Sequence, residues 1–81
     1  MSKISQSDVI AVVEKALKME LGQLKENTRA EEIESWDSLG QLSILVALDN
    51  LFKGKIASIN EMAQADSITK ILNILRQKSL L

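Results

Sequence analysis

An acid and a hydroxyl side chain stand together at Asp37-Ser38, directly before the apolar segment from Leu39 to Phe52. Asp and Ser are both favoured at a helix start, where a side-chain oxygen accepts a hydrogen bond from a free backbone N–H. The same place carries the positive end of the helix dipole and can hold a phosphate esterified to a serine. The pair therefore predicts a helix start, and Ser38 is either only a cap or also an acceptor of a phosphate ester.

The chain contains no His and no Cys, and the spacing of its Lys residues does not indicate a Ser-Lys arrangement that could activate Ser38. This composition excludes Ser-His-Asp and Cys-His catalytic arrangements, thiolate nucleophiles, disulfides and the usual zinc ligand sets. Any chemistry at the Ser38 hydroxyl must therefore be performed by another enzyme. We expect a protein that is not itself an enzyme, with no catalytic residues and no metal site.

The composition predicts one small helical domain that covers residues 1–81. Hydrophobic residues make up 46% of the chain, and Trp36 and Phe52 are its only aromatic residues, so aliphatic side chains must build the core. Such a composition favours helices over sheets. Ten basic and eleven acidic residues give a net charge of -1. This balance argues against nucleic-acid binding through a basic surface.

The sequence shows neither a charged segment leading into a signal-like apolar run nor an apolar stretch that could cross a bilayer. We therefore expect a cytoplasmic protein with no membrane span, and a monomer.

Helical periodicity predicts a first helix that ends near Gly22, with Ser5 or Ser7 as its cap. Glu14, Lys15 and Lys18 lie on its polar side. Its apolar face comprises Val9, Val12, Val13, Ala16, Leu17 and Leu21. A long polar loop follows over residues 22–36, in which the apolar anchors are Leu24, Ile33 and Trp36.

A second helix is predicted to begin at Asp37 or Ser38 and to end around Phe52, before the glycine stop at Gly54. A short third helix spans Ile59, Met62 and Ala63. Asp66 or Ser67 caps the last helix, whose apolar face comprises Ile68, Ile71, Leu72, Ile74 and Leu75. The predicted fold is all-α: a small four-helix bundle with three longer helices, one short helix and a long first loop.

The second helix is apolar on two sides. One arc faces the core and comprises Ile44, Leu45, Leu48, Leu51 and Phe52. The other contains Leu39, Leu42 and Val46 and is edged by Ser43, Asp49 and Asn50. Such a helix is either buried between neighbours or exposes one side to a partner. Because so small a domain has few helices to cover it, we expect Leu39, Leu42 and Val46 to be exposed.

The segment DSLGQLSILVALDNLF, preceded by Ile33 and Trp36, resembles the phosphopantetheine-attachment segment of acyl carrier proteins. The Asp-Ser-Leu core is short, but Leu, Ala-Leu and the terminal Phe follow it at the family's spacing. Ile56, the short third helix and the Ser67-capped last helix match in order. The resemblance therefore covers nearly the whole chain in length and helix order.

This resemblance implies a carrier. A phosphopantetheinyl transferase would use coenzyme A and magnesium to attach 4'-phosphopantetheine to the Ser38 hydroxyl through a phosphodiester. The thiol of this arm would carry an acyl or aminoacyl group as a thioester. The resemblance places Asp37 and Leu39 beside the attachment site. It places Leu42, Val46 and Asp49 on the surface that the transferase, an acyl- or aminoacyl-loading enzyme and a downstream acyltransferase recognise.

The charge pattern departs from that of fatty-acid carriers, which typically place several acids along the second helix. The comparable positions here are Gly40, Ser43, Asp49 and Asn50, so one acid remains. Patterned surface charges steer encounter and reject wrong partners. We therefore expect a discrete carrier of a specialised bacterial pathway. The Trp36-Asp37-Ser38 segment is also similar to the attachment segment of such discrete carriers. The alternatives are the general acyl carrier of fatty-acid biosynthesis, and a helical protein-interaction module in which Ser38 is only a helix cap.

Overall fold

The computed structural model describes residues 4–81, which form three α-helices and two short 3₁₀ turns. In chain order these are α1 (Gln6–Ala16), η1 (Ala30–Glu32), α2 (Ser38–Leu51), η2 (Asn60–Gln64) and α3 (Ile68–Gln77). No strand forms within this range, where the only extended pairing is an isolated antiparallel bridge between Arg29 and Ser67. The prediction of an all-α fold is confirmed.

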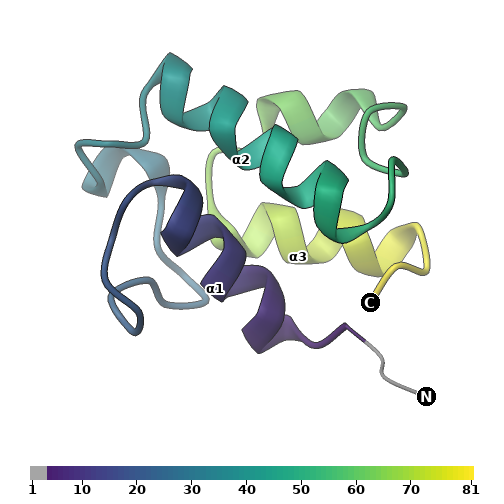
Figure 1. Cartoon of the computed structure of the whole chain (residues 1–81), viewed down its shortest axis with the longest axis horizontal. Coiled ribbons are helices and arrows are strands. Elements are labelled where there is room, and N and C mark those ends of the chain that lie inside the picture. The colour runs from purple at the N-terminus through teal and green to yellow at the C-terminus, as the bar shows by residue number, and fades with distance from the viewer. Residues whose placement is uncertain (1–3) are drawn as a thin grey trace.

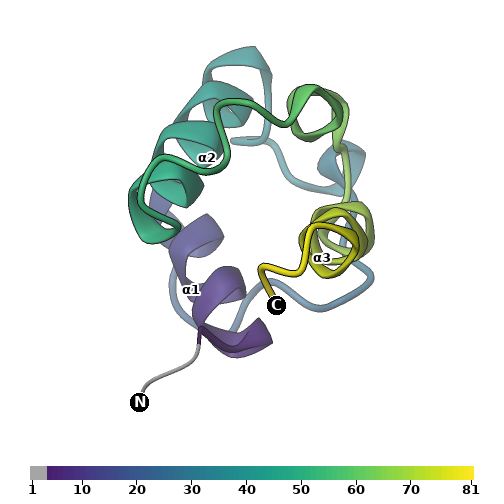
Figure 2. The same cartoon turned by 90° about the vertical axis from the view of Figure 1, so that its right-hand side faces the viewer.

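The helices surround one hydrophobic core. α1 runs antiparallel to α2 and packs against it more extensively than any other pair of elements (Figure 1). Seen from the end, α1, α2, η2 and α3 form a ring (Figure 2). The buried hydrophobic side chains inside it are Val9, Val13, Leu17, Leu24, Trp36, Ile44, Leu48, Phe52, Ile56, Ile59, Met62, Ala65, Ile68, Ile71, Leu72 and Leu75.

The start of α1 agrees with the prediction, but its end does not. Ser5 caps the helix, and Ser5 and Asp8 exchange side-chain-to-backbone hydrogen bonds. The helix ends at Ala16 and not near Gly22, because Lys18 adopts a left-handed backbone conformation (φ 59°). Leu21 therefore lies outside the helix and is 77% exposed, whereas the prediction placed it on the core face.

All three α-helices of the described chain end in the same way. The residue after the cap is left-handed, and it is Lys18, Lys53 and Ser79 in turn. After α2, the N–H of Gly54 donates to the carbonyl of Asp49 at 2.8 Å and that of Lys53 to the carbonyl of Asn50 at 3.4 Å. This is the Schellman arrangement. The helix thus ends at the predicted place, and Gly54 is left-handed (φ 85°) as well, but Lys53 occupies the position where glycine is usual.

The predicted short third helix is instead the 3₁₀ turn η2, so the fold has three α-helices and two 3₁₀ turns and not the predicted four-helix bundle. Its bonds join residues three apart, from the Met62 N–H to the Ile59 carbonyl and from the Ala65 N–H to the Met62 carbonyl, both 3.2 Å. The carbonyls of Met62 and Ala63 also accept from the Gln41 side chain. A segment this short does not propagate an α-helix by itself.

The long first loop is fixed at two places. Leu24 and Trp36 are buried and Ile33 is half-buried, which confirms the three predicted anchors. Glu14, predicted on the polar face of α1, is only 2% exposed, and its Oε2 accepts a 2.8 Å hydrogen bond from the Leu24 N–H. Beyond Leu24, residues 28–30 pair with residues 66–68 through two backbone hydrogen bonds of 2.7 and 2.9 Å. The loop is therefore held by α1 and by the start of α3.

Lys53→Gly should raise the free energy of unfolding by about 0.5–1 kcal/mol. A left-handed conformation costs an L-residue about 1–2 kcal/mol, and the entropy that glycine loses on folding offsets part of the gain. Urea unfolding measures the difference. Lys55→Gly is the control, because Lys55 is exposed but not left-handed; it should not stabilise. A less stable Lys53→Gly variant would contradict this account of the helix end.

Candidate functional site

The start of α2 separates the roles of Asp37 and Ser38. Asp37 is the cap, since its Oδ1 accepts a 2.9 Å hydrogen bond from the Gly40 N–H. Ser38 is the first helical residue and is exposed. Among the side-chain hydrogen bonds within residues 4–81, none involves the Ser38 hydroxyl. This hydroxyl is therefore accessible to another protein and is not used in capping.

Gly40 is a site residue that the sequence analysis missed. It is buried, and a Cβ atom at this position would lie 2.1 Å from the Ser35 carbonyl oxygen and 3.0 Å from Leu17 Cδ2. No side chain fits there without moving the loop that enters α2. The available signal was a glycine inside a predicted helix, where it is unfavourable unless the backbone approaches closely.

Trp36 and Gln41 connect the start of α2 to η2. The Trp36 Nε1–H donates to Gln41 Oε1 at 2.6 Å, and Gln41 Nε2 donates to the carbonyls of Met62 and Ala63, both at 3.1 Å. Trp36 is only 6% exposed, so its predicted role as a loop anchor is confirmed. The sequence gives no sign of the second connection, because Gln41 and η2 lie far apart along the chain.

Two hollows lie along the contact between α2 and η2. One, of about 390 Å³, is bordered by Trp36, Asp37, Ser38, Gln41 and residues 63–66. The other, of about 350 Å³, is a cleft with mainly aliphatic residues in its lining, called here the apolar cleft; it is lined by Leu45, Val46, Asp49, Asn50, Ile56, Ala57, Ile59, Asn60 and Ala63. Ser38 therefore borders the first hollow, and Ala63 of η2 is the one residue that lines both hollows.

The predicted apolar strip is exposed. Leu39, Leu42 and Val46 are 75%, 57% and 55% exposed, which confirms that this face of α2 has no partner within the described chain. Asp49 behaves differently, because its Oδ1 accepts hydrogen bonds from the N–H groups of Ile56 (3.1 Å) and Ala57 (2.9 Å). The single acid on α2 therefore holds the following loop in place.

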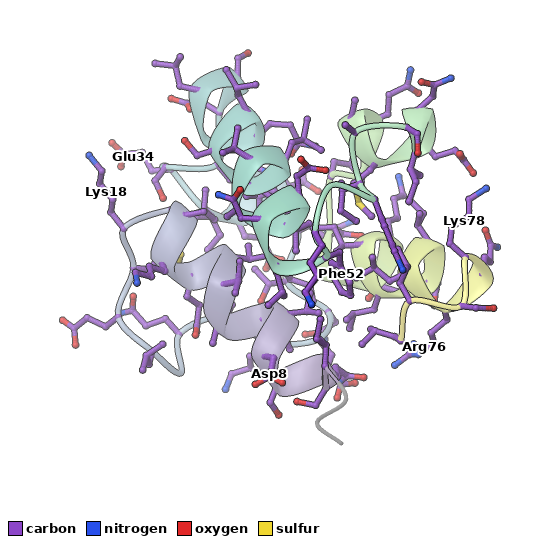
Figure 3. All side chains as sticks on the ribbon, turned by 45° about the vertical axis from the view of Figure 1, so that its right-hand side comes forward. Asp8, Lys18, Glu34, Phe52, Arg76 and Lys78 are labelled. Carbon is purple, nitrogen blue, oxygen red and sulfur yellow. The ribbon has the colours of Figure 1, made fainter. Side chains whose placement is uncertain are left out.

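One ionised acid, Asp66, borders the hollow beside Ser38. The hydrogen bond and charge of Lys70, at 2.8 Å, lower the pKa of the Asp66 carboxyl. It is therefore ionised at neutral pH. Glu34, in the loop before α2, lies at the end of the molecule opposite to Arg76 and Lys78 (Figure 3). Lys18 lies beside Glu34 at that end, so acidic and basic side chains occur together there, whereas Arg76 and Lys78 lie at the far end (Figure 3).

Within residues 4–81, no helix has both the length and the apolar character needed to cross a membrane, and no three acidic, His or Cys side chains gather where a metal ion could bind. Comparisons of the chain with protein-family models, with curated proteins and with solved structures give no match.

Asp37→Ala should lower the free energy of unfolding by about 1 kcal/mol, because it removes the acceptor for the Gly40 N–H. Ser38→Ala should change it by less than about 0.5 kcal/mol, as expected for an exposed side chain without a partner. Urea denaturation of both variants beside the wild type measures the two effects. Equal losses would mean that Ser38 shares the capping role.

Proposed function

We propose that this protein is an acyl carrier, modified at Ser38 with 4'-phosphopantetheine and loaded by other enzymes. The observation that carries the proposal is an exposed serine hydroxyl at the first turn of a helix that another residue caps. The Asp37 carboxylate accepts a hydrogen bond from the Gly40 N–H. The backbone N–H groups of Ser38 and Leu39, which precede Gly40 in the first turn, remain able to donate hydrogen bonds to a phosphate. These groups fit the attachment of a phosphodiester.

In the proposed modification, the Ser38 oxygen attacks the phosphorus of coenzyme A that bears the pantetheine. A new P–O bond forms, the pyrophosphate P–O bond breaks, and adenosine 3',5'-bisphosphate leaves. The serine proton passes to a base of the transferase, whose Mg²⁺ stabilises the charge on the leaving group. The carrier contributes an accessible hydroxyl and the positive end of the α2 dipole, which favours the phosphodiester anion.

The arm supplies a terminal thiol to a chain that has no Cys. This thiol holds an acyl or aminoacyl group as a thioester while the loading enzyme and a downstream acyltransferase act on it. The apolar cleft beside Leu45, Val46 and Ile59 offers the acyl chain a place away from water. The protein thus acts as a substrate of other enzymes and performs no catalysis of its own.

The surface of α2 supports partners that differ from those of fatty-acid synthesis. Leu39, Leu42 and Val46 form an exposed apolar strip next to Ser38, and such strips mark protein contacts. The one acid of the helix, Asp49, is engaged by Ile56 and Ala57, so at most its free oxygen is left for a basic partner. We therefore assign the carrier to a specialised bacterial pathway in the cytoplasm, acting as a monomer, with general fatty-acid biosynthesis as the alternative.

A helical protein-interaction module is the second candidate, because the same apolar strip would accept a partner helix. In that alternative Ser38 was expected to serve as the cap. Asp37 provides the cap instead. The interaction-module hypothesis therefore assigns no role to the Ser38 hydroxyl. The carrier gives it one.

Coexpression with a broad-specificity phosphopantetheinyl transferase should add the mass of one phosphopantetheine group, measured on the intact protein. Ser38→Ala should abolish the gain. Ser35→Ala and Ser43→Ala should retain it, because these exposed serines flank the site without being acceptors. An unchanged mass for the wild type, or modification of Ser38→Ala, would refute the assignment.

Leu42→Ser should slow the transferase reaction about fivefold or more, as the loss of a central apolar contact does at protein interfaces. Stability should stay within about 0.5 kcal/mol of the wild type, because the side chain is exposed. Leu21→Ser is the matched control, since Leu21 is equally apolar and 77% exposed but lies in the first loop. Equal transfer rates for the two variants, measured with purified transferase and coenzyme A, would exclude Leu42 from docking.

A further inference from the structure

Gln41 stands between the hollow beside Ser38 and the apolar cleft. Ser38, Gln41 and Leu45 follow one another at helical spacings of three and four residues and so share one side of α2. Ser38 and Gln41 border the first hollow, Leu45 borders the second, and Ala63 of η2 lines both. The two hydrogen bonds from Gln41 Nε2 to the carbonyls of Met62 and Ala63 therefore cross the contact between α2 and η2 where the hollows adjoin.

Trp36 fixes the direction of the Gln41 amide. Its Nε1–H holds Gln41 Oε1 at 2.6 Å, so Nε2 faces η2. Trp36 is itself buried against the core and cannot readily follow a rotation of the amide. On the other side, η2 is a 3₁₀ turn, in which hydrogen bonds have poorer geometry than in an α-helix. Of the two partners of the Gln41 side chain, η2 is thus the one with the weaker backbone hydrogen bonds.

We propose that Gln41 is a latch that selects, by chain length, which cargo passes from Ser38 into the apolar cleft. The proposal rests on the carrier function, which makes the acyl chain on the Ser38 arm the occupant of the cleft. A chain that enters must displace the amide from both carbonyls. Short or polar cargo leaves the latch closed and stays accessible to partner enzymes, whereas a longer apolar chain opens it.

General magnitudes give the length at which the latch opens. Each neutral hydrogen bond changes an equilibrium constant by about fivefold. Breaking both bonds therefore lowers the equilibrium constant for opening the latch by about twenty-five- to thirtyfold. Each methylene group buried favours opening by about fourfold. Burial of about two to three methylene groups therefore offsets the latch. We expect acyl chains longer than this to occupy the cleft and shorter ones to remain outside it.

The test uses full-length protein loaded at Ser38 with acetyl or octanoyl phosphopantetheine from the corresponding coenzyme A thioester. Methyl NMR signals of Leu45, Val46 and Ile59 report occupancy of the cleft. In the wild type, octanoyl should shift these signals relative to acetyl. In Gln41→Glu, which keeps the acceptor for Trp36 but loses the donor to η2, chains two or three methylene groups shorter should produce the same shifts. Ser43→Ala, exposed on the same helix, should behave as the wild type.

A second measurement separates failure of the latch from failure of the carrier assignment. Unmodified protein is titrated with S-octanoyl-N-acetylcysteamine, a soluble thioester, and binding should be about tenfold or more tighter to Gln41→Glu and Gln41→Ala than to the wild type. Emission of Trp36, the single tryptophan, verifies that Gln41→Glu and Gln41→Ala remain folded. Equal affinities with folded variants, shifts confined to residues outside the cleft, or an octanoyl chain that leaves the cleft signals unchanged would overturn the latch even if Ser38 is modified.

Discussion

The close approach of the Ser35 carbonyl to Gly40 is the constraint on which the site depends. A Cβ atom on residue 40 would lie 2.1 Å from that oxygen, so only glycine lets the first loop turn this tightly into α2. The turn sends Trp36 inward, where it is buried, and leaves Asp37 extended at the helix start with its carboxylate on the Gly40 N–H. Ser38 then follows as the first helical residue with its hydroxyl outside. The close contact between the Ser35 carbonyl and Gly40 thus sets the course of the turn that leaves Ser38 exposed.

Polar side chains hold the irregular parts of this small fold. Glu14 accepts from the N–H of Leu24, Asp49 accepts from those of Ile56 and Ala57, and Gln41 donates to the carbonyls of η2. Backbone groups buried in loops need partners that helices supply automatically. No buried side-chain nitrogen or oxygen within the described residues lacks one. These few side chains therefore hold the long first loop and the α2–η2 connection against the helices. The Asp49 carboxylate on α2 thus has a structural role within the fold.

Features set by residues close in sequence could be predicted, and features set by distant contacts could not. Helical periodicity and capping residues are local, and they predicted the bounds of α2, a cap of α3 at Asp66 or Ser67, which the structure resolves to Ser67, and the exposed strip at Leu39. The early end of α1 depends on a left-handed Lys18, and Glu14 was placed on the wrong face because its partner, Leu24, lies in the loop. The helical spacing of Ile59, Met62 and Ala63 predicts a short helix, but the spacing alone does not distinguish an α-helix from the 3₁₀ turn η2 that forms there.

The same division holds within the candidate site. Asp37 and Ser38 were identified from residue type and position, yet either could have been the cap, because both side chains accept hydrogen bonds from a first-turn N–H. Three-dimensional placement resolves this choice, since only the Asp37 carboxylate lies on the Gly40 N–H. The connection from Trp36 through Gln41 to η2 has no local signature at all. It joins a loop, a helix and a turn that meet only after folding.

The separation of cap from serine bears directly on function. A serine retained for capping would have its oxygen on a backbone N–H, and its replacement would weaken the helix. Here the helix start is built by Asp37, Gly40 and Trp36, while the Ser38 oxygen contributes no hydrogen bond to the described chain. A residue that the fold does not use, placed where free N–H groups and the helix dipole favour an anion, is free to be an acceptor. Because Asp37, Gly40 and Trp36 hold the helix start, the modification of Ser38 that we propose would leave the hydrogen bonds of that start intact.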